Sequence, residues 1–152
     1  MSSVIDLYDR ITGLLSGRVF EGLALLFARL ALAAQFWISG RTKVEEGSWL
    51  QIKEVQYLIF ENEFSGLPIS PDLAVPMTVY AEFFLPILLA IGLATRFAAA
   101  GLLVMTLVIQ FFVFPDAWWS VHIMWTALAA ILIARGAGIF SIDHIAGLAR
   151  QK

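Results

Sequence analysis

Apolar residues dominate four long stretches of this chain, and charged residues gather between them. The stretches cover residues 22–40, 76–94, 97–114 and 118–135. Each is close to the roughly 20 residues that a helix needs to cross about 30 Å of hydrocarbon. Very short connections join the last three, which predicts tight antiparallel hairpins. The sequence therefore predicts an all-α polytopic membrane protein, a four-transmembrane-helix antiparallel bundle in which residues 1–152 form a single domain.

Three further segments have the pattern of short helices at the membrane surface. Residues 4–20 place apolar residues near helical spacing, with charged residues between them, which suits a helix lying in the interface. Residues 48–60 predict a second interfacial helix. Residues 141–149 predict a third, with Ser141 as its N-terminal cap.

Composition supports the membrane assignment, because 60% of the residues are hydrophobic, 14% are charged and the mean hydropathy is +0.83. A soluble domain of this size would expose much of that apolar surface. Four spans place both termini on one side, and basic residues favour the cytoplasmic side. The side of the termini would carry Arg10, Arg18, Arg96, Arg135, Arg150 and Lys152, against Arg41, Lys43 and Lys53 on the other. We therefore expect both termini in the cytoplasm.

Several kinds of chemistry are excluded for the chain acting alone. It contains no cysteine, so it carries no thiolate nucleophile and no cysteine-ligated cluster. His122 and His144 are predicted on opposite sides of the membrane, so neither zinc nor haem has an evident ligand set. The net charge of −2 and the lack of a basic patch argue against a nucleic-acid partner.

One polar residue interrupts each apolar stretch, namely Gln35, Glu82, Gln110 and His122. The helical rise places all four roughly 6 to 9 Å inside the same membrane boundary. Polar groups at that depth are costly and tend to be functional or paired. For the two glutamines, hydrogen bonding between helices is the simpler explanation. Ordinary packing is likewise the simpler explanation of Trp125, Phe83, Phe84, Phe111 and Phe112, although these rings could also wall a pocket for a flat ligand.

Packing alone is a weaker explanation for Glu82 and Arg29, because both are ionisable. Glu82 has to be paired, hydrated or protonated, and Lys43 and His122 are its candidate partners. A structural ion pair and a proton, quinone or substrate role both remain open. Arg29 either snorkels to the cytoplasmic interface or faces the interior, on the same helical face as Lys43. The candidate intramembrane polar site is thus Arg29, Gln35, Lys43, Glu82, Gln110 and His122, with no catalytic residue and no metal assigned.

Part of this pattern resembles a known family. The series Arg29, Ser39-Gly40-Arg41-Thr42-Lys43, Glu82 and Gly92-Leu93-Ala94-Thr95-Arg96 is similar to that of DoxX proteins, small four-helix membrane proteins of bacteria. The resemblance extends from about residue 22 to residue 135. It marks Arg29, Gly40, Lys43, Glu82, Gly92 and Arg96 as family-type positions, and it implies a bacterial inner (plasma) membrane location.

The resemblance implies function only loosely. Such proteins are associated with thiosulfate-quinone oxidoreductase subunits, with complexes that handle oxidative or thiol stress, and with metal or peptide maturation. We expect an accessory subunit that is not an enzyme on its own, with a pocket around Glu82. A quinone-linked subunit using Glu82, His122 and Lys43 for proton exchange is an alternative, and a small proton-coupled carrier with a route past Arg29 is another. No intrinsic cofactor is evident, and quinone is a candidate. The expected partners are the lipid bilayer, proteins encoded nearby and a second copy of the chain.

Overall fold

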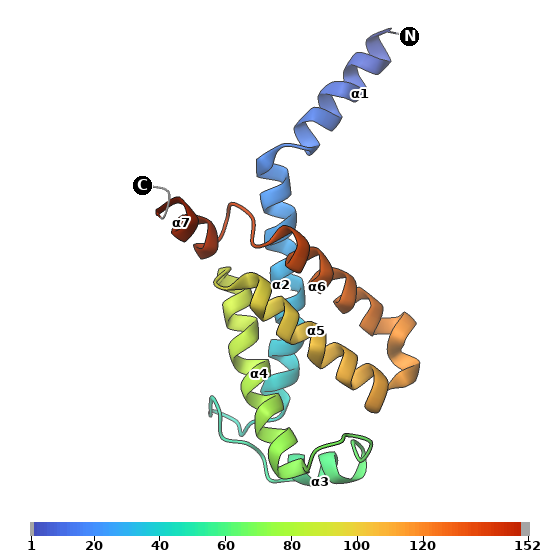
Figure 1. Cartoon of the computed structure of the whole chain (residues 1–152), viewed down its shortest axis with the longest axis vertical. Helices are drawn as coiled ribbons and strands as arrows, with labels where there is room; N and C mark the ends of the chain where they lie inside the picture. The colour runs from blue at the N-terminus through green and yellow to red at the C-terminus, as the bar shows by residue number, and fades with distance from the viewer. Residues whose placement is uncertain (1, 150–152) are drawn as a thin grey trace.

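The computed structural model describes residues 2–149 and is built from helices (Figure 1). Their order along the chain is α1 (Ser2–Leu15), α2 (Arg18–Thr42), α3 (Val55–Asn62), α4 (Pro71–Ile91), α5 (Thr95–Phe112), the short η1 (Pro115–Ala117) and η2 (Trp118–His122), α6 (Ile123–Arg135) and α7 (Ile142–Ala149).

Four of these segments are long and apolar enough to cross a membrane: α2, α4, α5 and the continuous segment Pro115–Arg135. α2 packs against α4 and α6, and α5 packs against the same two helices. One fully buried leucine from each helix meets in the core, namely Leu32, Leu89, Leu102 and Leu132. The predicted all-α polytopic membrane protein is confirmed.

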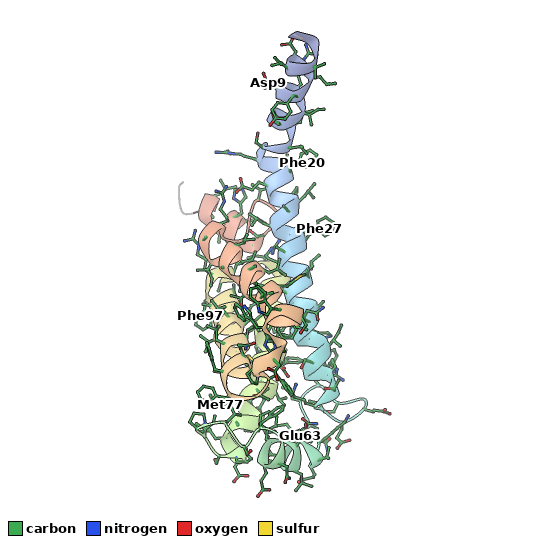
Figure 2. The ribbon with its side chains drawn as sticks, turned by 90° about the vertical axis from the view of Figure 1, so that its right-hand side faces the viewer. Asp9, Phe20, Phe27, Glu63, Met77 and Phe97 are labelled. Atoms are coloured by element: carbon green, nitrogen blue, oxygen red, sulfur yellow. The ribbon has the colours of Figure 1, made fainter. Side chains whose placement is uncertain are left out.

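The outer faces of the long helices are apolar as well. Phe27 on α2 and Phe97 on α5 are each 69% exposed, and Figure 2 shows them pointing away from the bundle on opposite sides. Large apolar side chains in these positions suit contact with hydrocarbon rather than water.

The bounds of α2 and α4 differ from those of the predicted spans. α2 runs from Arg18 to Thr42, so the helix predicted at residues 4–20 divides at Gly17, whose backbone is extended. α4 begins at Pro71 rather than at residue 76. Proline suits the first helical turn, where its missing N–H would have no partner. α1 extends from the N-terminal end of α2, away from the other helices (Figure 1).

The surface segments were predicted with mixed success. The helix predicted at residues 48–60 is wrong in its first half, because Val44 and Ile52 pair in an antiparallel bridge across a turn with Gly47 at a φ of +76°. α3 therefore forms only over Val55–Asn62. The helix predicted at residues 141–149 is present as α7, and Ser141 caps it, since the backbone N–H of His144 donates to Ser141 Oγ at 3.2 Å.

Candidate functional site

Glu82, on α4, meets the C-terminal end of α2 through an ion pair. Lys43 Nζ lies 2.7 Å from Glu82 Oε2, and Ser39 Oγ donates a hydrogen bond of 2.9 Å to Oε1. Lys43 Nζ also donates to Ser39 Oγ at 2.8 Å. Glu82 is only 2% exposed, so its charge needs a partner. The structure thus makes Lys43, rather than His122, the charged partner of Glu82. We call these three residues the Glu82 cluster.

Gly40 allows the two helices to approach closely enough for this pairing. A Cβ atom at Gly40 would lie 2.9 Å from Glu82 Cβ and 3.2 Å from the Glu82 carbonyl oxygen. The first distance is shorter than carbon atoms in contact tolerate. Glycine at this position therefore lets α2 and α4 touch, and it brings Ser39 and Lys43 within reach of the carboxylate.

A second polar group lies where the fourth span begins. His122 Nδ1 lies 2.7 Å from Gln110 Oε1, and Gln110 Nε2 donates to the carbonyl oxygen of Pro115 at 2.6 Å. Both side chains are buried. His122 ends η2, a single π-helical turn in which the N–H of Ile123 bonds back to Trp118. Such turns often occur at functional sites, because the extra residue redirects a side chain.

A cavity of about 380 Å³ lies beside both groups. Side chains from α2, α4, α5 and the fourth span form its walls, and Phe60 of α3 and Phe64, which follows α3, cover one end. Its polar lining residues are Gln35, Ser39, Lys43, Thr78, Glu82 and His122; the other lining residues are apolar. This combination of apolar walls and a few polar groups is typical of small-molecule sites.

The cavity is not sealed from its surroundings. Five of its lining residues are exposed. Gln35, Met77 and Val104 lie on the spanning helices α2, α4 and α5, whereas Ile69 and Phe114 lie in the segments that precede α4 and follow α5. Met77 is 55% exposed and Val104 is 60% exposed, and Figure 2 shows Met77 at the surface. The cavity is therefore bordered by exposed residues both within spanning helices and in connecting segments.

Four of the six predicted site residues therefore line one cavity: Gln35, Lys43, Glu82 and His122. Gln110 does not line the cavity, but it fixes the ring of His122 through the hydrogen bond to Nδ1. Arg29 does not belong to this group, because 14 residues of α2 separate it from Lys43, or about 21 Å along the helix.

Arg29 instead belongs to the other end of the bundle, where it is completely buried. Its guanidinium donates to the carbonyl oxygens of Leu89 at 3.4 Å, Ala90 at 3.3 Å and Phe140. The first two belong to the last turn of α4, whose dipole favours a cation. The interior alternative for Arg29 is thus the one observed, and the snorkelling alternative is wrong.

Gly92 and Asp143 complete this second group, which we call the Arg29 cluster. Gly92 ends α4 with a φ of +70°, and a Cβ atom there would lie 2.0 Å from Arg29 Nη1. The Asp143 carboxylate accepts hydrogen bonds from the N–H groups of Ala94 at 2.8 Å and Thr95 at 2.9 Å, and so caps α5. Burial raises the pKa of Asp143, but these hydrogen bonds and the charge of Arg29 outweigh it, so the pKa lies below its usual value.

Sequence reasoning missed several of the cavity residues. Ser39 and Thr78 are ordinary in spanning helices, and only the spacing of Ser39 one turn before Lys43 signals its role. The alternative of an aromatic pocket wall holds only for Trp125, because Phe83, Phe84, Phe111 and Phe112 do not line the cavity. Trp125 does line it and packs against Phe36 and His122, with ring centroids 5.2 and 5.4 Å apart.

Comparison with known proteins identifies the family of the chain. Residues 24–115 match the family model for DoxX. The chain belongs to the DoxX family. An uncharacterized protein of Haemophilus influenzae (strain ATCC 51907 / DSM 11121 / KW20 / Rd) is 30% identical to this DoxX chain over 132 residues, which cover 82% of this chain and 84% of the relative. No solved structure matches the chain.

The DoxX-type positions now have physical roles at two separate places. Lys43 and Glu82 belong to the Glu82 cluster, which Gly40 allows to form, and Arg29 and Gly92 belong to the Arg29 cluster. Arg96 donates to the carbonyl oxygen of Ala134 at 3.3 Å and so links α5 to the end of α6.

Proposed function

We propose that this DoxX protein is an accessory subunit of a membrane complex in the bacterial inner membrane, and that it binds a small lipid-like molecule beside Glu82. The observation that carries the proposal is the cavity of about 380 Å³, with its apolar walls and the Lys43–Glu82 pair on its lining. A ligand with an apolar body and a polar head fits such a lining.

The accessory role is supported by the chemistry that the chain lacks. Without cysteine it offers no thiol or thiolate for electron transfer or nucleophilic attack. Any redox group of the complex would therefore come from a partner, and a protein encoded nearby is the expected source. We further propose that both termini lie in the cytoplasm, because the basic residues are enriched on their side of the predicted topology.

A cavity-filling substitution tests whether the cavity binds a ligand. Ala81 lines the cavity, so Ala81→Phe should displace the lipid-like molecules that co-purify with the protein. Ala130→Phe is the matched control, because Ala130 is exposed on α6 outside the cavity. Mass spectrometry of organic extracts from both purified variants gives the comparison. Equal ligand content in both variants would overturn the proposed site.

The accessory role needs its own experiment. Affinity purification from cross-linked native membranes should recover this chain together with a partner, and the purified chain alone should turn over no quinone. Quinone reduction by the isolated chain would contradict the accessory role and favour an enzyme.

A quinone-linked oxidoreductase subunit is the second candidate, because Glu82 and His122 line the same cavity. A carboxylate and an imidazole on one cavity are suited to exchange protons with a bound quinone. In membranes that contain the whole complex, Glu82→Gln should then slow quinone reduction. An unchanged rate would remove Glu82 from the mechanism.

The carrier hypothesis receives no support from the site. Its inner route would pass Arg29, whose guanidinium is fully buried against Gly92 and bonded to three carbonyl oxygens.

A further inference from the structure

A chain of hydrogen bonds fixes the position of the proton on His122. The carbonyl oxygen of Pro115 can only accept, so the NH₂ group of Gln110 faces it. The amide oxygen of Gln110 therefore faces His122, and because this oxygen also only accepts, His122 Nδ1 must carry the proton. In the neutral ring the other nitrogen, Nε2, is then a hydrogen-bond acceptor.

This acceptor belongs to a side chain that lines the cavity. Among residues 2–149, no hydrogen bond of the structure involves His122 Nε2, whereas Nδ1 is held by Gln110. Phe36 and Trp125 are the aromatic neighbours of the cavity on this side. An acceptor in such apolar surroundings is stabilised by a ligand that brings a donor, and it disfavours a ligand that brings only acceptors.

We infer that the cavity selects lipid-like molecules whose polar head is a hydroxyl group, with the hydroxyl donating to His122 Nε2. This inference rests on the proposed binding function and adds the chemical class of the ligand. A carbonyl or carboxylate head would turn its lone pairs toward the lone pair of Nε2. A cationic amine could donate, but Lys43 already pairs with Glu82, the only carboxylate among residues 2–149 that lines the cavity, so the charge of the amine would have no counterion of its own.

Gln110 is the positioning residue in this arrangement, and Pro115 positions Gln110 in turn. Both lie at the junction between α5 and the fourth span, so the turn between these helices determines which nitrogen of His122 carries the proton. His122 is the last residue of the π-helical turn, and its ring lies on the cavity lining.

The proton position can be measured without any ligand. The chain has two histidines, so a ¹⁵N-histidine spectrum in nanodiscs, recorded at a pH where both rings are neutral, contains one exposed reference, His144, and His122. We expect His122 as the pure Nδ1–H form, and Gln110→Leu should abolish that preference. A wild-type His122 with its proton on Nε2 would overturn the inference and would leave the proposed cavity untouched.

Two matched probes test the ligand class. Para-heptylphenol carries the hydroxyl donor, and para-heptylanisole is its methyl ether without a donor. Binding to the protein in nanodiscs, corrected for partition into empty nanodiscs, should be about tenfold tighter for the phenol, as expected for one hydrogen bond to a buried acceptor. His122→Phe should remove the difference, and the control His144→Phe should keep it.

The outcomes separate the two proposals. Equal affinity for phenol and ether, with both displaced by Ala81→Phe, would overturn the hydroxyl selection and support the cavity as a binding site. Binding of neither probe, or binding that Ala81→Phe leaves unchanged, would overturn both. If His122→Phe does not fold, Gln110→Leu replaces it, and an unchanged phenol preference in that variant would contradict the positioning role of Gln110.

Discussion

The two polar clusters of this DoxX protein are built from similar materials and have opposite characters. Each places one basic side chain, from α2 or from the residue that caps its C-terminus, against α4, and each depends on a glycine that admits the contact. The Glu82 cluster borders a cavity of about 380 Å³, whereas Arg29 is fully enclosed and bonded to backbone carbonyls. The difference indicates that the Arg29 cluster holds the bundle together, and it supports the proposal that the Glu82 cluster borders a ligand site.

Removing Arg29 should have the largest effect on stability. Arg29→Met leaves the carbonyl oxygens of Ala90 and Phe140 without the guanidinium donor, whereas the carbonyl oxygen of Leu89 still accepts from the N–H of Gly92. Groups without partners cost about 1–3 kcal/mol each, and the buried space that the guanidinium leaves adds to this cost, so a loss of at least about 3 kcal/mol is expected. Thermal unfolding in nanodiscs measures it, with Arg96→Met as the control because Arg96 is exposed. Similar losses in both variants would refute the role of Arg29 in holding the bundle together.

Gly92→Ala should have the next largest effect, and Gly47→Ala provides a matched control. Both glycines have a positive φ, so both substitutions carry the cost of about 1–2 kcal/mol for that conformation. Of the two positions, only Gly92 brings the new Cβ against neighbours, namely Arg29 Nη1 and Ser141 Cβ, whereas nothing lies within 4 Å of the Cβ at Gly47. The unfolding midpoint of Gly92→Ala should therefore fall well below that of the control. Equal midpoints would mean that Arg29 simply moves aside.

Breaking the Lys43–Glu82 pair should cost less than removing Arg29. Lys43→Met leaves the Glu82 carboxylate without its cation, but Glu82 lines a cavity and can be protonated or solvated there. We expect a loss of about 1–3 kcal/mol, below the 3–5 kcal/mol typical of fully enclosed pairs. The double variant Lys43→Met/Glu82→Met should recover most of it. A double variant that is less stable than either single variant would show that the pair is a structural element.

The smallest effect concerns pH, through the cap that Asp143 forms on α5. The pKa of Asp143 in the folded protein lies below its usual value, so the unfolded chain binds the proton more readily. The stabilisation is therefore complete above the usual pKa and disappears as the pH falls through the lowered one. Asp143→Asn should make stability independent of pH in that acidic window, as followed by unfolding at successive pH values. A parallel pH dependence in both proteins would assign the effect to other carboxyl groups.

The fold was predictable because a bilayer imposes strong rules on a sequence. Apolar stretches of spanning length, separated by charged segments, determine the number and order of the long helices. The bounds were less predictable where local chemistry decides, as at Gly17 and in the bridge between Val44 and Ile52. These depend on turns and on pairing between segments that hydropathy does not reveal.

The candidate site was predictable only as far as energetic cost singles out residues. Glu82, Lys43 and Arg29 stand out because ionisable groups are rare in a span. Depth alone suggested a belt of Gln35, Glu82, Gln110 and His122, but depth does not determine which direction a side chain points. Gln35 is thus exposed at the cavity edge, and Gln110 stands behind His122. The roles of Gly40 and Gly92 required the distances between helices.

The most direct test of the difference between the clusters is photolabelling in native membranes. An alkylphenol carrying a diazirine should label residues that line the cavity and are not exposed, such as Ala81, Met105 and Trp125, and mass spectrometry of the digested protein locates the label. Competition by unlabelled para-heptylphenol should remove it. Label that is confined to lipid-facing residues such as Phe27 and Phe97, or that no competitor removes, would contradict a ligand site beside Glu82.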